Sequence, residues 1–97
     1  MEDRLKILLI DDEMHLRVII KAYLSIYNID ILETDDGAEA LGIMESENID
    51  LVILDYNMPK MSGDEILNNM LGDDRLSKIP VVMYTAASFE KEQDKWL

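Results

Sequence analysis

The chain has 97 residues and a formal net charge of −12, and 48% of its residues are hydrophobic. This length allows one domain at most, and the composition is typical of a folded chain rather than a disordered one. The excess of acids argues against direct contact with nucleic acid, because Lys and Arg supply the attraction for phosphates. There is no cysteine and only one histidine, so any metal would be held by oxygen ligands.

The same acidity argues against binding to an anionic membrane. The sequence has no apolar run of about 18 residues, as a membrane span would need, and no signal-peptide pattern at its N-terminus. We therefore expect a cytoplasmic domain.

Strand and helix patterns alternate from the N-terminus. The run Leu5–Ile10 is apolar except for Lys6, which is typical of a strand in a parallel sheet. A helix is predicted from Met14 to Tyr27, because apolar residues recur there at three- and four-residue spacing, at Leu16, Ile19, Ile20, Tyr23, Leu24 and Tyr27. A second strand is predicted from Ile29 to Leu32.

The second half of the chain continues the alternation. Asp36 and Gly37 open a second helix, and its inward face is predicted to comprise Ala38, Leu41 and Met44. The remaining elements are a strand over 49–54, a loop over 55–63, a helix ending around Gly72, a strand over 79–84 and a helix over 89–97 with Ser88 as its cap.

Polar residues follow three of the predicted strands. Asp11 and Asp12 come after the first strand, Asp55 after the third and Thr85 after the fourth. Strands separated by helices predict a parallel sheet with helices on both faces, and ligand sites in such sheets lie beyond the carboxyl ends of the strands. Carboxylates gathered there repel one another unless a cation lies between them, so the pattern predicts a bound metal.

Three segments carry a family resemblance: 7–13 (ILLIDDE), 50–63 (DLVILDYNMPKMSG) and 79–86 (IPVVMYTA). Together they resemble the receiver domain of two-component response regulators, from about Leu5 to the last residue. The resemblance implies an α/β fold of the flavodoxin-like, doubly wound type. It also implies phosphoryl transfer from a phosphohistidine, on a sensor histidine kinase or phosphotransfer protein, to Asp55.

The resemblance also implies roles for the residues of the site. Asp12 and Asp55 would bind Mg²⁺ directly, Asp11 would bind it through water, and the backbone carbonyl of Asn57 would complete the protein ligands. Mn²⁺ is the alternative metal. The Thr85 hydroxyl and the backbone amide of Ala86 would contact the phosphoryl group and draw their loop inward, which would make the domain a switch.

The sequence departs from the family at its C-terminal end. A receiver continues with a fifth strand that ends in a lysine and then a fifth helix, whereas this chain ends at Leu97. We therefore expect one C-terminally incomplete receiver domain over 1–97, with strand order 2-1-3-4. The fourth strand would be an open edge, through which the chain could form a homodimer. Lys60, Lys91 and Lys95 are poor substitutes for the lysine, and Lys60 is expected to be exposed.

The leading functional prediction is a phosphoacceptor signalling domain rather than a conventional enzyme. It would act with Mg²⁺ and control an output domain or a protein target. The alternative is an interaction or dimerisation module that works without phosphorylation. A haloacid dehalogenase type of enzyme ranks third, because it would need an acid two positions after the nucleophile, where this chain has Asn57.

Overall fold

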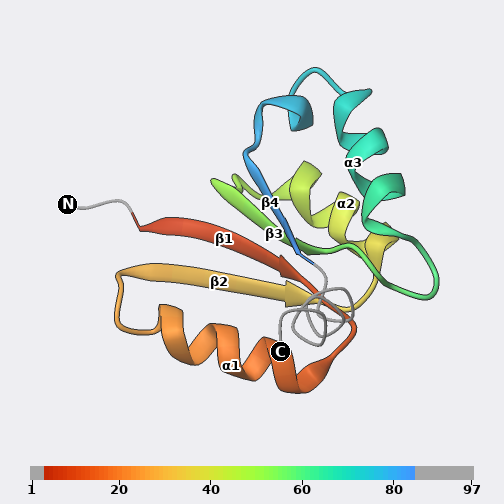
Figure 1. Cartoon of the computed structure of the whole chain (residues 1–97). Coiled ribbons are helices and arrows are strands. Elements are labelled where there is room, and N and C mark those ends of the chain that lie inside the picture. The colour runs from red at the N-terminus through yellow and green to blue at the C-terminus, as the bar shows by residue number, and fades with distance from the viewer. Residues whose placement is uncertain (1–3, 85–97) are drawn as a thin grey trace, which may run out of the picture.

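The computed structural model describes residues 4–84. Strands and helices alternate along this part of the chain (Figure 1). In chain order they are β1 (Leu5–Ile10), α1 (Met14–Leu24), β2 (Ile29–Thr34), α2 (Gly37–Ser46), β3 (Leu51–Asp55), α3 (Gly63–Leu71), a 3-10 helix (Leu76–Lys78) and β4 (Val81–Tyr84).

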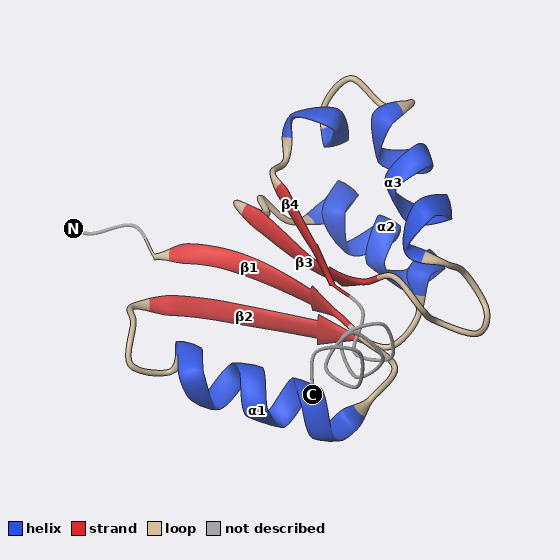
Figure 2. Cartoon of the chain, viewed as in Figure 1, coloured by secondary structure: helices blue, strands red, loops and turns tan. Residues whose placement is uncertain are grey.

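The strands form one parallel sheet in the order β2-β1-β3-β4. Helix α1 lies on one face of the sheet, and α2 and α3 lie on the other (Figure 2). The predicted strand order and flavodoxin-like fold are confirmed. Because all strands run in the same direction, their carboxyl ends meet at one edge of the sheet (Figure 1).

The main core fills the space between the sheet and the pair α2 and α3. Leu8 and Ile10 of β1 and Leu54 of β3 are fully buried in it. Helices α2 and α3 contribute Met44 and Ile66, which are also fully buried. This core fixes the positions of β1 and β3, the two strands that lead into the predicted site.

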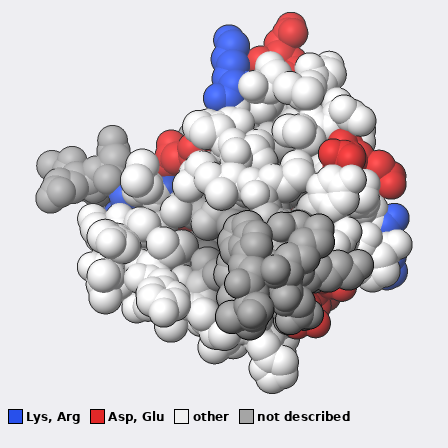
Figure 3. All heavy atoms as spheres, viewed as in Figure 1, with Lys and Arg blue, Asp and Glu red and all other residues white. Residues whose placement is uncertain are grey.

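Helix α1 is less buried than its apolar stripe predicts. It ends at Leu24, not at Tyr27, and none of its residues is fully buried. Ile19 is 50% exposed and Tyr23 is 75% exposed. Within residues 4–84, α1 is the only helix on its face of the sheet, so the flanks of its stripe remain in water. In the view of Figure 3, uncharged side chains (white) dominate the region around α1.

Other boundaries and faces also differ from the predictions. The buried face of α2 comprises Gly37, Ala40 and Met44, whereas Ala38 is exposed because it lies one position round the helix from Gly37. Strand β2 extends to Thr34, β3 begins at Leu51, and β4 begins after Pro80, which has no N–H to donate to a strand ladder. The 3-10 helix was not predicted.

The predicted open edge is confirmed only in part. Strand β4 is an edge of the described sheet, and its Val82 is 53% exposed. Val81 and Met83 are partly buried and pack against the main core. The predictions for Thr85, Ala86, Ser88 and the helix over 89–97, which carries Lys91 and Lys95, lie outside the described residues. Among those described, no helix is long and apolar enough to span a membrane.

Candidate functional site

Three carboxylates meet at the carboxyl edge of the sheet. Asp11 directly follows β1 and Asp55 is the last residue of β3, so the pairing of these strands brings them together. With Asp12 they form a cluster in which one oxygen from each carboxylate lies within 4.8 Å of the others. Asp11 and Asp55 are buried, and Asp12 is exposed. The predicted convergence of these acids is therefore observed.

Asp11 is held by its backbone and by its side chain. Its N–H donates to the Thr34 carbonyl at 3.1 Å, and its carbonyl accepts from Nη1 of Arg17 at 2.6 Å. Its Oδ1 accepts from the N–H of Glu13 at 2.7 Å, and its Oδ2 accepts from the hydroxyl of Tyr84. These contacts fix the carboxylate in one orientation at the edge of the sheet.

Asp55 lies in an environment that disfavours its charge. Burial is the main cause that raises its pKa to about 6, and the nearby charges of Asp11 and Asp12 add to the shift. The backbone N–H of Asn57 opposes it by donating to Oδ1 of Asp55 at 3.1 Å. A cation between the three acids would favour the ionised form of Asp55, which is the form that can act as a nucleophile.

The backbone after Asp55 packs closely against the start of α3. A Cβ atom on Gly63 would lie 2.9 Å from Cα of Tyr56 and 3.2 Å from the carbonyl oxygen of Asp55. The N–H of Gly63 donates to the Tyr56 carbonyl at 2.9 Å. None of the described glycines has a positive φ, so a left-handed turn does not explain Gly63. Gly63 is required by this close approach instead.

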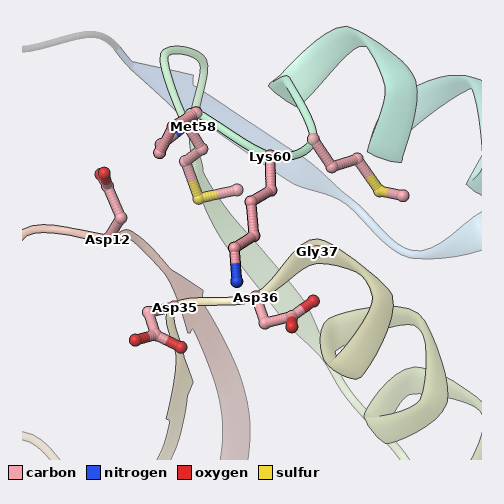
Figure 4. Close-up of a pocket in the computed structure, with 8 residues that line it drawn as sticks. Asp12, Asp35, Asp36, Gly37, Met58 and Lys60 are labelled. Carbon is pink, nitrogen blue, oxygen red and sulfur yellow. The ribbon is translucent and has the colours of Figure 1, made fainter.

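A pocket of about 210 Å³ lies beside Asp12. It is lined by residues from three loops and the start of α2, namely Asp12, Asp35, Asp36, Gly37, Met58, Pro59, Lys60 and Met61. Figure 4 shows the ammonium of Lys60 reaching into this pocket toward the Asp35 and Asp36 turn. Lys60 is exposed, as predicted. It is the one basic residue in the pocket lining.

Sequence reasoning missed three residues at or beside the site. Asp35 and Asp36 follow β2, the strand that was predicted to end at Leu32, so their position at the carboxyl edge was not recognised. Tyr84 appeared to be the last apolar residue of a strand, but its hydroxyl reaches Asp11. An aromatic hydroxyl at a strand end, directly before Thr85, was the available signal.

The donor set fits a hard divalent cation. The cluster offers carboxylate oxygens only, and Mg²⁺ and Mn²⁺ prefer oxygen ligands. Magnesium also keeps several of its waters, so two or three carboxylates are enough to hold it. The exposed Asp12 leaves the cluster open to solvent on one side.

Comparison with known proteins identifies the type of domain that the sequence motifs resemble. The family profile "Response regulator receiver domain" matches residues 7–97. The chemotaxis protein CheY of Pseudomonas aeruginosa is 41% identical over 83 residues, which cover 84% of this chain and 67% of that protein. The probable transcriptional regulator ycf27 of Porphyridium aerugineum is also 41% identical over 83 residues, but the chain spans only 33% of its length.

Solved structures show the same fold. The phosphorylated cyanobacterial phytochrome response regulator RcpA aligns with a TM-score of 0.81 and 28% identity, covering 95% of this chain and 72% of that one. The chemotaxis response regulator CheY4 of Vibrio cholerae aligns with a TM-score of 0.80 and 29% identity, covering 95% of this chain and 78% of that one.

Proposed function

This chain belongs to the response regulator receiver family, and on that premise we propose that it accepts a phosphoryl group on Asp55 from a histidine kinase or phosphotransfer protein. Receiver domains are signalling domains of two-component systems. The observation that carries the proposal is the position of Asp55, buried at the end of β3 with Asp11 and Asp12 beside it.

Asp55 would act as the nucleophile. One of its carboxylate oxygens attacks the phosphorus of the phosphohistidine, an O–P bond forms, and the N–P bond breaks with its electron pair returning to the imidazole. The backbone N–H of Asn57 holds the carboxylate in place through Oδ1. The product is an acyl phosphate, which water can hydrolyse, so the switch can return to its starting state.

Asp12, Asp55 and the backbone carbonyl of Asn57 would hold Mg²⁺ directly, and Asp11 would hold it through water, with Mn²⁺ as the alternative. The bound cation would neutralise the negative charge of the transferring phosphoryl oxygens. The buried Asp11 is fixed by Glu13 and Arg17, so it would present its carboxylate to the cation without reorganising its backbone.

Thr85 and Ala86 follow β4 directly in the sequence. We assign the Thr85 hydroxyl and the Ala86 amide to the phosphoryl oxygens once Asp55 is modified. Their movement would carry the signal to an output domain or a protein target in the cytoplasm, and the domain would promote only its own phosphorylation and dephosphorylation.

Two structural proposals accompany this function. Residues 1–97 would belong to one receiver domain. The exposed Val82 on the β4 edge is the feature that would support homodimer formation. In residues 4–84, no observation favours the alternative of a module that works without phosphorylation.

Intact-protein mass spectrometry tests the proposed function. After incubation with Mg²⁺ and acetyl phosphate, the parent chain should gain one phosphoryl group, and Asp55→Asn should gain none. Asp74→Asn is the matched control, because Asp74 is exposed and remote in sequence from the three acids of the cluster. A folded parent chain that gains no mass would overturn the proposal.

A further inference from the structure

Tyr84 makes a contact that the proposed chemistry does not require. It is the last residue of β4, and its hydroxyl donates to Oδ2 of Asp11, a residue 73 positions away in the sequence. Strand β3 lies between β4 and β1 in the sheet, so the side chain reaches past the end of β3 to make this bond. The contact joins two strands that do not pair with each other.

The backbone of Tyr84 is fixed, and this defines where the ring can reach. Tyr84 pairs with Asp55 in the β3–β4 register, and its carbonyl accepts from the N–H of Tyr56 at 2.7 Å. The side chain is partly buried. Burial and the bond to Asp11 raise the pKa of Tyr84, and the charges of Asp55 and Asp12 contribute as well. The hydroxyl therefore lies in the field of all three carboxylates.

A hydroxyl hydrogen can offset only part of the repulsion within this cluster. A divalent cation would offset far more of it, and it would need the same Asp11 carboxylate, either directly or through water. The other oxygen of Asp11 already accepts from the N–H of Glu13 at 2.7 Å. The Tyr84 hydroxyl and the cation would therefore compete for Oδ2 of Asp11.

We propose that the Tyr84 hydroxyl is a placeholder for the cation: it stabilises Asp11 in the metal-free site and is displaced when Mg²⁺ binds. This inference rests on the proposed function, because it presupposes a metal site at the three acids. Displacement of the Tyr84 hydroxyl would change the end of β4 when the metal binds, one residue before Thr85. Tyr84 is thus a positioning residue that lowers the affinity of the site for the metal, and its side chain moves when the metal binds.

Isothermal titration calorimetry with Mg²⁺, on protein first stripped with EDTA, tests the proposal. Tyr84→Phe should bind Mg²⁺ about tenfold more tightly than the parent, since a hydrogen bond to a charged acceptor no longer has to be broken. Tyr56→Phe is the matched control, because its hydroxyl donates to Asp64 at 2.9 Å and not to the cluster. It should bind with the parent affinity.

Near-ultraviolet difference spectra give a second readout that a purely structural role would not change. Adding Mg²⁺ should perturb a tyrosine in the parent and in Tyr56→Phe, but not in Tyr84→Phe. Equal or weaker Mg²⁺ binding by folded Tyr84→Phe would overturn the placeholder. If Tyr84→Phe does not fold, the absence of a tyrosine signal in the parent would overturn it. A folded parent that binds no Mg²⁺ would overturn both the role of Tyr84 and the proposed function.

Discussion

At the scale of single residues, Asp55 combines two opposing requirements. A buried carboxyl group positioned by β3 gives precise geometry, but burial also disfavours the charge that a nucleophile needs. Asp11 and Asp12 increase this cost in the metal-free protein and would lower it when they hold a cation. On the proposed function, the cluster would make the ionised, reactive form of Asp55 depend on a bound cation.

The raised pKa of Asp55 predicts a pH dependence of stability in the metal-free protein. Its value of about 6 lies above the ordinary 3.8, so protonation favours the native state. The resulting stabilisation is complete below about pH 4 and is lost as the pH rises through 6, and its upper limit is about 3 kcal/mol. In EDTA, urea unfolding of the parent and of Asp55→Asn should differ in this pH window.

The expected difference between the two free energies of unfolding has a definite sign. Asp55→Asn has no charge to bury, so its free energy of unfolding should fall less than that of the parent between pH 5 and pH 7.5. Comparing the two proteins cancels the contribution of the other acids. Identical pH profiles for the two proteins would contradict the assigned environment of Asp55.

At the scale of elements, the start of α3 supports Asp55, the proposed nucleophile. Helix α3 begins with Gly63, and Ser62 caps it by accepting from the N–H of Glu65 at 3.3 Å. Because Gly63 has no side chain, the helix can approach the backbone of Asp55 and Tyr56. The packing of one helix terminus therefore helps to set the position of Asp55, the proposed phosphoacceptor.

Two glycine substitutions separate this packing role from helix propensity. Gly63→Ala should destabilise the protein by about 1–3 kcal/mol, because the methyl group would press on backbone atoms that cannot move easily. Gly42→Ala, in the middle of α2 with no atom within 4 Å of the added Cβ apart from its chain neighbours and the local helix backbone, should stabilise it by about 0.5–1 kcal/mol. Urea unfolding measures both. Full stability of Gly63→Ala would show that the close approach is not needed.

The elements also show what the sequence could and could not predict. Strands β1 and β3 were predicted to lead into Asp11 and Asp55, because an apolar run that ends in acids places those acids at the carboxyl edge of a parallel sheet. The prediction of the inward face of α2 was partly wrong. Ala38 and Ala40 are equally apolar, and only the position of the helix on the sheet distinguishes them. The Tyr84 contact depends on strand order and side-chain direction together, so the tyrosine at the strand end could not by itself identify Asp11 as its partner.

At the scale of the whole molecule, the parallel sheet turns distant segments of sequence into one site. Asp11 and Asp55 meet because β1 and β3 pair, and Tyr84 joins them because β4 lies beside β3. The sequence patterns and the resemblance to receiver domains predicted the strand order and the meeting of Asp11 and Asp55, but not the contact of Tyr84. The resemblance did not predict how the acids are held, since the contacts of Asp11 with Glu13, Arg17 and Tyr84 depend on the folded packing and not on a sequence motif.

The most direct test of the central claim is to map the phosphorylated residue. The parent chain would be incubated with acetyl phosphate in Mg²⁺ or in EDTA, the acyl phosphate reduced with borohydride, and the product analysed by peptide mass spectrometry. We predict modification at residue 55 in Mg²⁺ and its loss in EDTA. Modification of another carboxylate, or equal modification of residue 55 in EDTA, would contradict the claim that Asp55 is the metal-dependent phosphoacceptor.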